Sequence, residues 1–334
     1  MQAIVIRKAG GPEALKLESL DTPRPLAGHA LVRLKAAALN HRDVWQRIAY
    51  SGSGPMVLGS DGAGVVEAVG AGVDGAWVGK PVVINPGLHW GDREDAPGPN
   101  WQILGNPTPG TYAEVVHVPG ENLAPKPEHL DFRQAAALPL AGVTAWRGLF
   151  TQGQLRAGET VLLPGIGSGV AVLALAFAKR SGARVLVTSG SAEKLAAAKA
   201  AGADGGVNYK DADWEQQMRA LAGTAGIDLV LDHSGAQTIP AAVRLVRPGG
   251  RVVFLGVTTG TELKLNIREV FFKQLHLTGT TMGSPREFQA LFRFIEQHRY
   301  VPDVRHVFPL AEAGKAQALL ESGKQFGKVV LDIG

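Results

Sequence analysis

A cluster of glycines in the middle of the chain has the spacing of a phosphate-binding turn. The apolar run Thr160–Leu163 indicates a strand, and three glycines within five residues follow it, ahead of a helical stretch. Backbone N–H groups at a helix N-terminus can hold a pyrophosphate only where no Cβ intervenes. Val170 takes the sixth position of the G-x-G-x-x-G pattern, and Ala171 could supply the third small residue. The expected turn comprises Gly165, Gly167, Ser168, Gly169 and Val170.

The end of the next predicted strand favours NADP(H) over NAD. An NAD-binding unit places a carboxylate about 20 residues beyond the glycines, on the ribose hydroxyls. Here Ser189, Ser191 and Lys194 stand in that stretch, and its first carboxylate, Glu193, opens the following helix. Hydroxyls and an ammonium would bind a 2′-phosphate that a carboxylate would repel. The alternative is an ordinary helix cap by Ser191 with a solvated Lys194, and the two interpretations are compatible.

Composition excludes several classes of protein. The 334 residues suggest two domains, and the formal charge of +4 is spread along the chain, so nucleic acid is an unlikely partner. The absence of cysteine excludes disulfides and Cys-ligated zinc. No apolar run is long enough for a membrane span, and the first residues lack a signal-peptide pattern. We expect a soluble cytoplasmic protein with no membrane partner.

The pattern of predicted elements changes along the chain. Short apolar runs separated by Gly and Pro fill the first 125 residues and predict a barrel or folded sheet. Beyond Pro127, strands alternate with helices, which predicts a parallel, doubly wound sheet. One amphipathic helix follows Ser284, and the closing run 327–334 alternates like the N-terminal region. The predicted domains are 1–126 plus 285–334, and 127–284.

Four motifs resemble those of the medium-chain dehydrogenase/reductase superfamily, in particular its zinc-free, quinone oxidoreductase-like branch. They read LGSDGAGVVEAVGAGV (58–73), GTYAEVVHVP (110–119), AALPLAGVTAWRGL (136–149) and GKVVLDIG (327–334). The resemblance covers nearly the whole chain. It implies an α/β protein in which a Rossmann doubly wound parallel sheet is inserted into a GroES-like β-barrel substrate domain.

The resemblance also shows where this chain departs from the zinc-dependent members. Those enzymes bind catalytic zinc through a Cys and a Gly-His-Glu motif, and the matching positions here hold Asn40 and the sequence Gly59-Ser60-Asp61. Neither retains the soft or imidazole ligand that zinc prefers, so we predict no bound metal. Segment 85–110 resembles the structural-zinc lobe without its cysteines. We expect this lobe to be held by packing of Trp90 and Trp101.

Three residues are candidates for the reacting end of the site. Similar proteins of the zinc-free branch carry Asn at the position of Asn40, whose amide could donate to the substrate oxygen or the nicotinamide, or simply cap a helix. Tyr50 lies in a region that lines the substrate entrance in similar proteins, although a surface role is equally open. Thr144 resembles a Thr near the nicotinamide, with helix packing as its alternative. His41 and His233 are expected to make structural hydrogen bonds.

The resemblance adds further residues to the cofactor site. A Tyr at the position of Tyr209 covers the 2′-phosphate and adenine in similar NADP-dependent proteins. Gly256, Val257 and Thr258 would present backbone groups to the carboxamide. Lys324 stands where similar proteins offer a basic residue to the phosphate.

Together these features predict an NADPH-dependent, zinc-independent oxidoreductase. NADPH supplies the hydride, and without a Lewis acid the acceptor must spread its own negative charge, as quinones and conjugated enones do. The alternatives are a metal-free alcohol or aldehyde dehydrogenase and a non-catalytic NADPH-binding protein. The expected partner is a small-molecule acceptor: a quinone, an enone or an aldehyde. Strand 275–281, at a sheet edge, could pair across a two-fold axis in a homodimer or homotetramer.

Overall fold

The computed structural model describes residues 1–52 and 54–334, which form two compact units. The first comprises Met1–Val143 and Gly283–Gly334, and the second, Thr144–Met282, is inserted into it. Compared with the predicted ranges, the first unit continues to residue 143 instead of 126 and resumes at 283 instead of 285. The predicted boundary at residue 127 therefore lies 17 residues before the second unit begins at Thr144.

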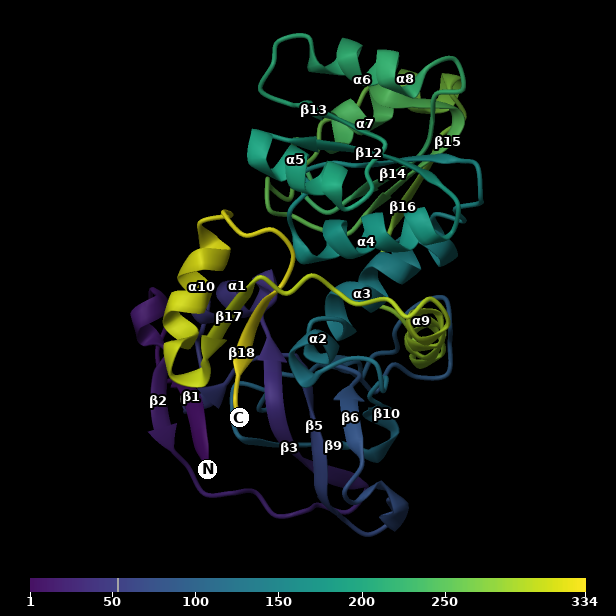
Figure 1. Cartoon of the computed structure of the whole chain (residues 1–334). Helices are drawn as coiled ribbons and strands as arrows, with labels where there is room; N and C mark the ends of the chain where they lie inside the picture. The colour runs from purple at the N-terminus through teal and green to yellow at the C-terminus, as the bar shows by residue number, and fades with distance from the viewer. Residues whose placement is uncertain (53) are drawn as a thin grey trace. The chain divides into compact units, whose positions relative to one another are not determined.

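The first unit is built mainly on antiparallel strands (Figure 1). Its strands are β1 (Gln2–Ile6), β2 (Lys16–Ser19), β3 (His29–Ala38), β4 (Met56–Val57), β5 (Asp61–Val69), β6 (Pro81–Ile84), β7 (Gly87–Leu88), β8 (Gln102–Ile103), β9 (Val115–Pro119), β10 (Leu123–Pro125), β17 (His306–Pro309) and β18 (Val329–Asp332). The main sheet has the order β10-β6-β5-β3-β18-β17, with β9 also paired to β3. Antiparallel pairing of β18 with β3 confirms that the closing strand belongs to this unit.

The first unit also contains five α-helices in the described residues. They are α1 (His41–Ile48), α2 (Phe132–Ala136), α3 (Pro139–Trp146, which runs into the second unit), α9 (Pro285–Gln297) and α10 (Ala313–Glu321). Pro139 separates two of these helices, because α2 ends before it and α3 begins on it. Helix α2 buries Ala135 and Ala136 and packs against β3, β5 and β18. This packing is the physical reason that residues 127–143 stay with the first unit.

Helix α1 is fixed to α10 by a buried arginine. The Arg47 side chain is fully buried, its Nε donates to Gln317 Oε1 at 2.7 Å, and Nη2 lies 2.6 Å from Glu321 Oε1. A buried guanidinium is tolerated only with such partners. The contact holds the helix that begins directly after Asn40.

The second unit is a six-stranded parallel sheet. Its strands are β11 (Thr160–Leu163), β12 (Arg184–Ser189), β13 (Gly205–Asn208), β14 (Ile227–Asp232), β15 (Val246–Phe254) and β16 (His276–Gly279). The order β13-β12-β11-β14-β15-β16 is that of a doubly wound dinucleotide-binding fold. Every residue of β11 is buried, as a strand covered on both faces requires. Strand β16 is an edge strand, and its predicted pairing across a two-fold axis stays a prediction.

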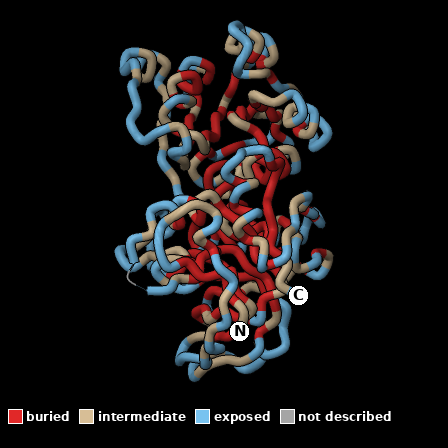
Figure 2. The backbone as a smooth tube through the Cα atoms, turned by 90° about the vertical axis from the view of Figure 1, so that its left-hand side faces the viewer, coloured by how far each residue is buried: buried red, intermediate tan, exposed pale blue. Residues whose placement is uncertain are grey.

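Helices lie on both faces of this sheet. They are α4 (Gly169–Arg180), α5 (Ala192–Ala200), α6 (Trp214–Ala222), α7 (Ile239–Leu245) and α8 (Ile267–Phe272), and a π-helix covers Arg147–Gln152. In Figure 1, α4 and α5 lie on one side and α6 to α8 on the other. Strands β11, β12 and β14 and most of helix α4 are buried, and Figure 2 draws the buried backbone in red. Among the described residues, no helix has the length and apolar character needed to cross a bilayer.

The lobe at residues 85–110 is held by aromatic packing, as predicted. Trp90 is buried, and its ring meets that of Trp101 edge to face, with centroids 5.9 Å apart. Strands β7 and β8 pair within the segment, so it is not a structureless loop. Leu104 is fully buried, and a Cβ at Gly105 would lie 2.6 Å from Gly59 O. The lobe therefore packs its backbone directly on the Gly59-Ser60-Asp61 segment.

Candidate functional site

The glycine turn of the second unit leads from β11 into α4. Gly165 and Gly167 have φ values of 65° and 129°, in the region that favours glycine. Ser168 is the N-cap of α4, and its Oγ accepts a hydrogen bond from Ala171 N at 3.2 Å. Gly169 and Val170 form the first turn of the helix. The turn thus presents a helix N-terminus of the kind that binds phosphate.

The end of β12 carries the predicted hydroxyls. Ser191 Oγ caps α5 by accepting from Lys194 N at 3.3 Å, and Ser189 Oγ accepts from Ser191 N at 3.2 Å. The capping alternative for Ser191 is therefore confirmed. A hydroxyl that accepts one bond still has its own proton to donate, so capping does not exclude a phosphate contact.

Lys194 lies over the glycine turn. A Cβ at Gly167 would be 3.0 Å from Lys194 Nζ, so the glycine leaves the space that the lysine fills. Burial lowers the pKa of Lys194. A nearby phosphate would favour its charged form.

Tyr209 and Lys210 face the turn between β12 and α5. A Cβ at Gly190 would lie 2.7 Å from Tyr209 Oη and 2.8 Å from Lys210 Cε. Tyr209 is 48% exposed, so its ring is accessible to a ligand. Sequence reasoning missed Lys210, although it directly follows Tyr209 in VNYKD. This side of the second unit combines two lysines, two serines and a tyrosine.

His233 follows β14 at the point where the strand order reverses. Its Nε2 lies 3.2 Å from Ser168 Oγ, which links the end of β14 to the glycine turn, and burial lowers its pKa. Ligands of doubly wound sheets bind at this reversal point. Gly256 approaches so closely that a Cβ there would lie 1.9 Å from His233 O, while Val257 and Thr258 are exposed. The structure thus brings the predicted loop 256–258 next to the reversal point.

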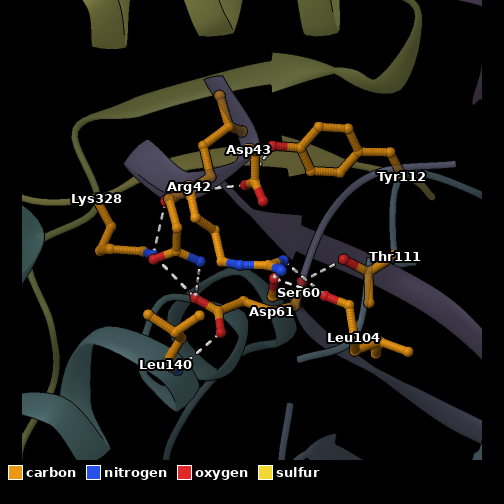
Figure 3. A network of polar contacts seen from close by, with 11 residues as sticks. Arg42, Asp43, Ser60, Asp61, Leu104, Thr111, Tyr112, Leu140 and Lys328 are labelled. Atoms are coloured by element: carbon orange, nitrogen blue, oxygen red, sulfur yellow. Dashed lines mark hydrogen bonds and ion pairs between the residues drawn. The ribbon is translucent and has the colours of Figure 1, made fainter. Parts of the chain in front are cut away.

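A buried ion pair organises the polar site of the first unit (Figure 3). Lys328 Nζ donates to Asp61 Oδ2 at 2.9 Å, to Asn40 Oδ1 at 2.6 Å and to Leu39 O at 2.7 Å. Asn40 Nδ2 also donates to Asp61 Oδ2 at 2.9 Å, and Leu140 N donates to Asp61 Oδ1 at 2.8 Å. The ammonium is saturated, and both carboxylate oxygens of Asp61 are occupied.

A second carboxylate lies beneath Asn40. Asp43 Oδ2 accepts from Asn40 N at 2.8 Å and from Tyr112 Oη at 2.9 Å. Both Asp43 and Tyr112 are fully buried, and burial raises the pKa of each. These bonds fix the backbone at Asn40, the N-cap residue of α1, and its side-chain amide also reaches Asp61 and Lys328.

Arg42 is the second cation of this site. Its Nη1 donates to Ser60 Oγ at 2.8 Å and to Leu104 O at 3.0 Å, and Ser60 Oγ itself donates to Leu104 O at 2.8 Å. Burial lowers the pKa of the guanidinium. The lobe residue Leu104 therefore orients a charged group beside Asn40.

The other predicted site residues lie as follows. Tyr50 Oη donates to Gly54 O. Thr144 is buried in α3, and Lys324 is exposed after α10, with its backbone N–H directed to Ser322 Oγ at 3.4 Å. The roles of all three stay predictions.

Sequence reasoning missed the site roles of Arg42, Tyr112 and Lys328. Lys328 had a detectable signal, because it is the one charged residue leading the apolar run KVVL in a quoted motif.

A doubly wound nucleotide-binding unit and a GroES-like unit define an NAD(P)-dependent oxidoreductase. Residues 26–128 match the family "Alcohol dehydrogenase GroES-like domain", and residues 169–297 match "Zinc-binding dehydrogenase". The chain belongs to the medium-chain dehydrogenase/reductase superfamily.

Relatives span the whole chain and differ in their described activities. A zinc-type alcohol dehydrogenase-like protein YogA of Leptosphaeria maculans is 36% identical, with 98% of each chain covered. A quinone oxidoreductase of Rattus norvegicus is 31% identical over 99% of this chain and 97% of its own. A solved NAD-dependent alcohol dehydrogenase is 45% identical, with full coverage of both chains and a TM-score of 0.94.

The donor set around Asn40 does not suit the zinc that the family names imply. Asn40 Oδ1 accepts from the ammonium of Lys328, and Ser60 Oγ accepts from the guanidinium of Arg42. Amide and hydroxyl oxygens are poor zinc ligands, and two neighbouring cations would repel the ion. Within residues 1–52 and 54–334, no three His, Asp or Glu side chains gather into a group that could hold a metal.

The buried ion pair yields a test of stability. Lys328→Met leaves the Asp61 carboxylate without its cation, and we expect it to lower the free energy of unfolding by about 3–5 kcal/mol. Adding Asp61→Asn removes the uncompensated charge and should recover part of the loss. Lys179→Met, which breaks a partly exposed pair with Asp204, should cost no more than about 1 kcal/mol. Urea unfolding followed by circular dichroism measures the free energy of unfolding of wild type and the three variants. Equal costs for the two lysines would contradict a special role of the buried pair.

Proposed function

We propose that the protein is an NADPH-dependent, zinc-independent oxidoreductase that transfers hydride to a quinone or a conjugated enone. The observation that carries this proposal is the site at Asn40. There Asn40 and Ser60, at the positions that match the zinc ligands of zinc-dependent members, accept hydrogen bonds from the cations of Lys328 and Arg42. Such a site offers hydrogen-bond donors to an acceptor oxygen. It suits acceptors whose negative charge is already delocalised.

Preference for NADPH is supported by the charge of the second unit's binding surface. Lys194 lies over the glycine turn, and Tyr209 and Lys210 face the turn at Gly190. These groups would hold a 2′-phosphate, with Ser189 and Ser191 donating their hydroxyl protons. Bound NADPH would supply the hydride.

The remaining predicted residues complete the proposed roles. Backbone groups of Gly256, Val257 and Thr258 would hold the carboxamide, and Lys324 would contribute to phosphate binding. Thr144 would pack near the nicotinamide. In the first unit, Asn40 would donate its second Nδ2 proton to the acceptor oxygen, and Tyr50 would line the acceptor entrance.

Turnover with a panel of acceptors tests the activity and its metal independence. We expect purified protein to consume NADPH with a quinone and an enone, far faster than with an aldehyde, because only the first two delocalise the charge that hydride adds. Prolonged chelation should leave these rates unchanged. Zinc bound stoichiometrically, with activity lost on its removal, would overturn zinc independence. Preference for the aldehyde would instead indicate an alcohol or aldehyde dehydrogenase.

Cofactor titrations test the phosphate site. A hydrogen bond to a charged group contributes roughly 1.5–3 kcal/mol, so Lys194→Ala should weaken NADPH binding by roughly 10- to 150-fold. NADH lacks the phosphate and should bind the variant and wild type alike. Lys199→Ala, on the exposed side of the same helix, is the matched control and should change neither constant. Fluorescence titration gives the dissociation constants. Wild-type preference for NADH, or equal loss of both cofactors in Lys194→Ala, would refute the assignment.

A further inference from the structure

Arg42 is a cation with unused donors. Its Nη1 is committed to Ser60 Oγ and Leu104 O. The N–H groups of Nε and Nη2 make no hydrogen bond or ion pair with any residue in the described ranges 1–52 and 54–334. Neither atom is among the buried side-chain atoms without a partner, and the residue is only partly buried. Both nitrogens therefore reach accessible space.

Lys328, the neighbouring cation, has no donor left for a ligand. Lys328 Nζ already donates to three acceptors, and its side chain is 4% exposed. An ammonium has three donors in all. Of the two cations in this network, only Arg42 has donors left for a ligand.

Arg42 is fixed in place without a direct ion pair. Asp61 is occupied by Lys328, Asn40 and the backbone of Leu140, and Asp43 accepts from Asn40 N and Tyr112 Oη. Neither carboxylate makes an ion pair with Arg42 in the described chain. The guanidinium is instead anchored through neutral oxygens, Ser60 Oγ and Leu104 O. A cation held by neutral acceptors keeps its attraction for an external anion.

We propose that Arg42 is a catalytic residue that binds and stabilises the oxyanion formed on the acceptor during reduction. This inference rests on the proposed function. Hydride adds to the β-carbon of the enone, the C=C electrons form the new C–C π bond of an enolate, and the carbonyl electron pair moves to oxygen. Nε and Nη2 of Arg42 donate to that oxygen. A proton from water then completes the saturated ketone.

The guanidinium is suited to this task for two physical reasons. It stays charged at every working pH and presents its N–H groups in a rigid fork. Anchoring at Ser60 and Leu104 fixes the fork before the charge develops, so little reorganisation is needed as the reaction proceeds. The lobe thereby acquires a role through Leu104, as the support of the anion-binding group.

Binding of a stable enolate analogue tests the inference without turnover. The probe is 4-nitrophenolate, titrated by its absorbance against wild type, Arg42→Met and Arg42→Lys, with neutral 4-nitroanisole as the uncharged probe. We expect Arg42→Met to weaken nitrophenolate roughly 10- to 150-fold and to leave nitroanisole unchanged. Arg33→Gln, an exposed arginine on β3 that pairs with Glu67, is the control and should bind both probes as wild type does. Equal binding of nitrophenolate by wild type and Arg42→Met overturns the proposal.

Arg42→Lys keeps the charge and covers the case in which Arg42→Met fails to fold. The lysine lacks the fork, so we expect nitrophenolate affinity between those of wild type and Arg42→Met. If Arg42→Met does not fold, wild-type affinity in Arg42→Lys refutes the need for the fork, and weakened affinity for nitrophenolate alone supports it.

Steady-state kinetics separate a developing oxyanion from a permanent carboxylate on the substrate. With a neutral enone at saturating NADPH, Arg42→Met should lower kcat by about 10²–10³-fold while the KM for NADPH stays unchanged. If only the KM for carboxylate-bearing acceptors rises and kcat for the neutral enone is preserved, Arg42 binds a substrate carboxylate and the proposal is wrong. Wild type without activity on any quinone or enone would refute the proposed function, and nitrophenolate binding would still report on the anion site.

Discussion

The ion pair between Lys328 and Asp61 connects the segments that build the polar site of the first unit. Lys328 precedes β18, Asp61 begins β5, Asn40 ends the run from β3 into α1, and Leu140 begins α3. Both charges are almost fully buried. A buried charge is tolerated only when paired and hydrogen-bonded, so these four segments must adopt one arrangement.

The rest of the site follows from this constraint. With Asn40 held by Lys328 and Asp61, Arg42 and Asp43 shortly after it in the chain have fixed positions. Asp43 turns inward to the backbone of Asn40 and to Tyr112, and Arg42 turns to Ser60 and the lobe. Two carboxylates and two cations balance in formal charge. This balance is achieved by side chains alone.

The second unit works by a different principle. Its phosphate-binding turn depends on backbone geometry, because Gly165 and Gly167 adopt positive φ and leave room for Lys194. The side chains proposed to select the cofactor lie at the ends of two neighbouring parallel strands, β12 and β13, whose carboxyl ends meet at the same edge. One unit therefore presents the backbone N–H groups of a helix N-terminus with a half-buried lysine over the turn. The other supplies a rigid buried network.

Local sequence patterns determined much of this protein. Strand β11, the glycine turn and α4 follow from an apolar run, three glycines and a helical period, and the break at Pro139 follows from the missing N–H of proline. The Trp90–Trp101 contact was expected from the resemblance of segment 85–110 to the structural-zinc lobe, since a lobe without cysteine needs another support. Tertiary structure alone decided the polar network. Asn40 and Asp61 are 21 residues apart, and Asp61 and Lys328 are 267 residues apart. No local sequence pattern indicates that these side chains will contact one another. Their pairing arises because folding buries all three together, and a buried charge must find its partner wherever the topology brings one.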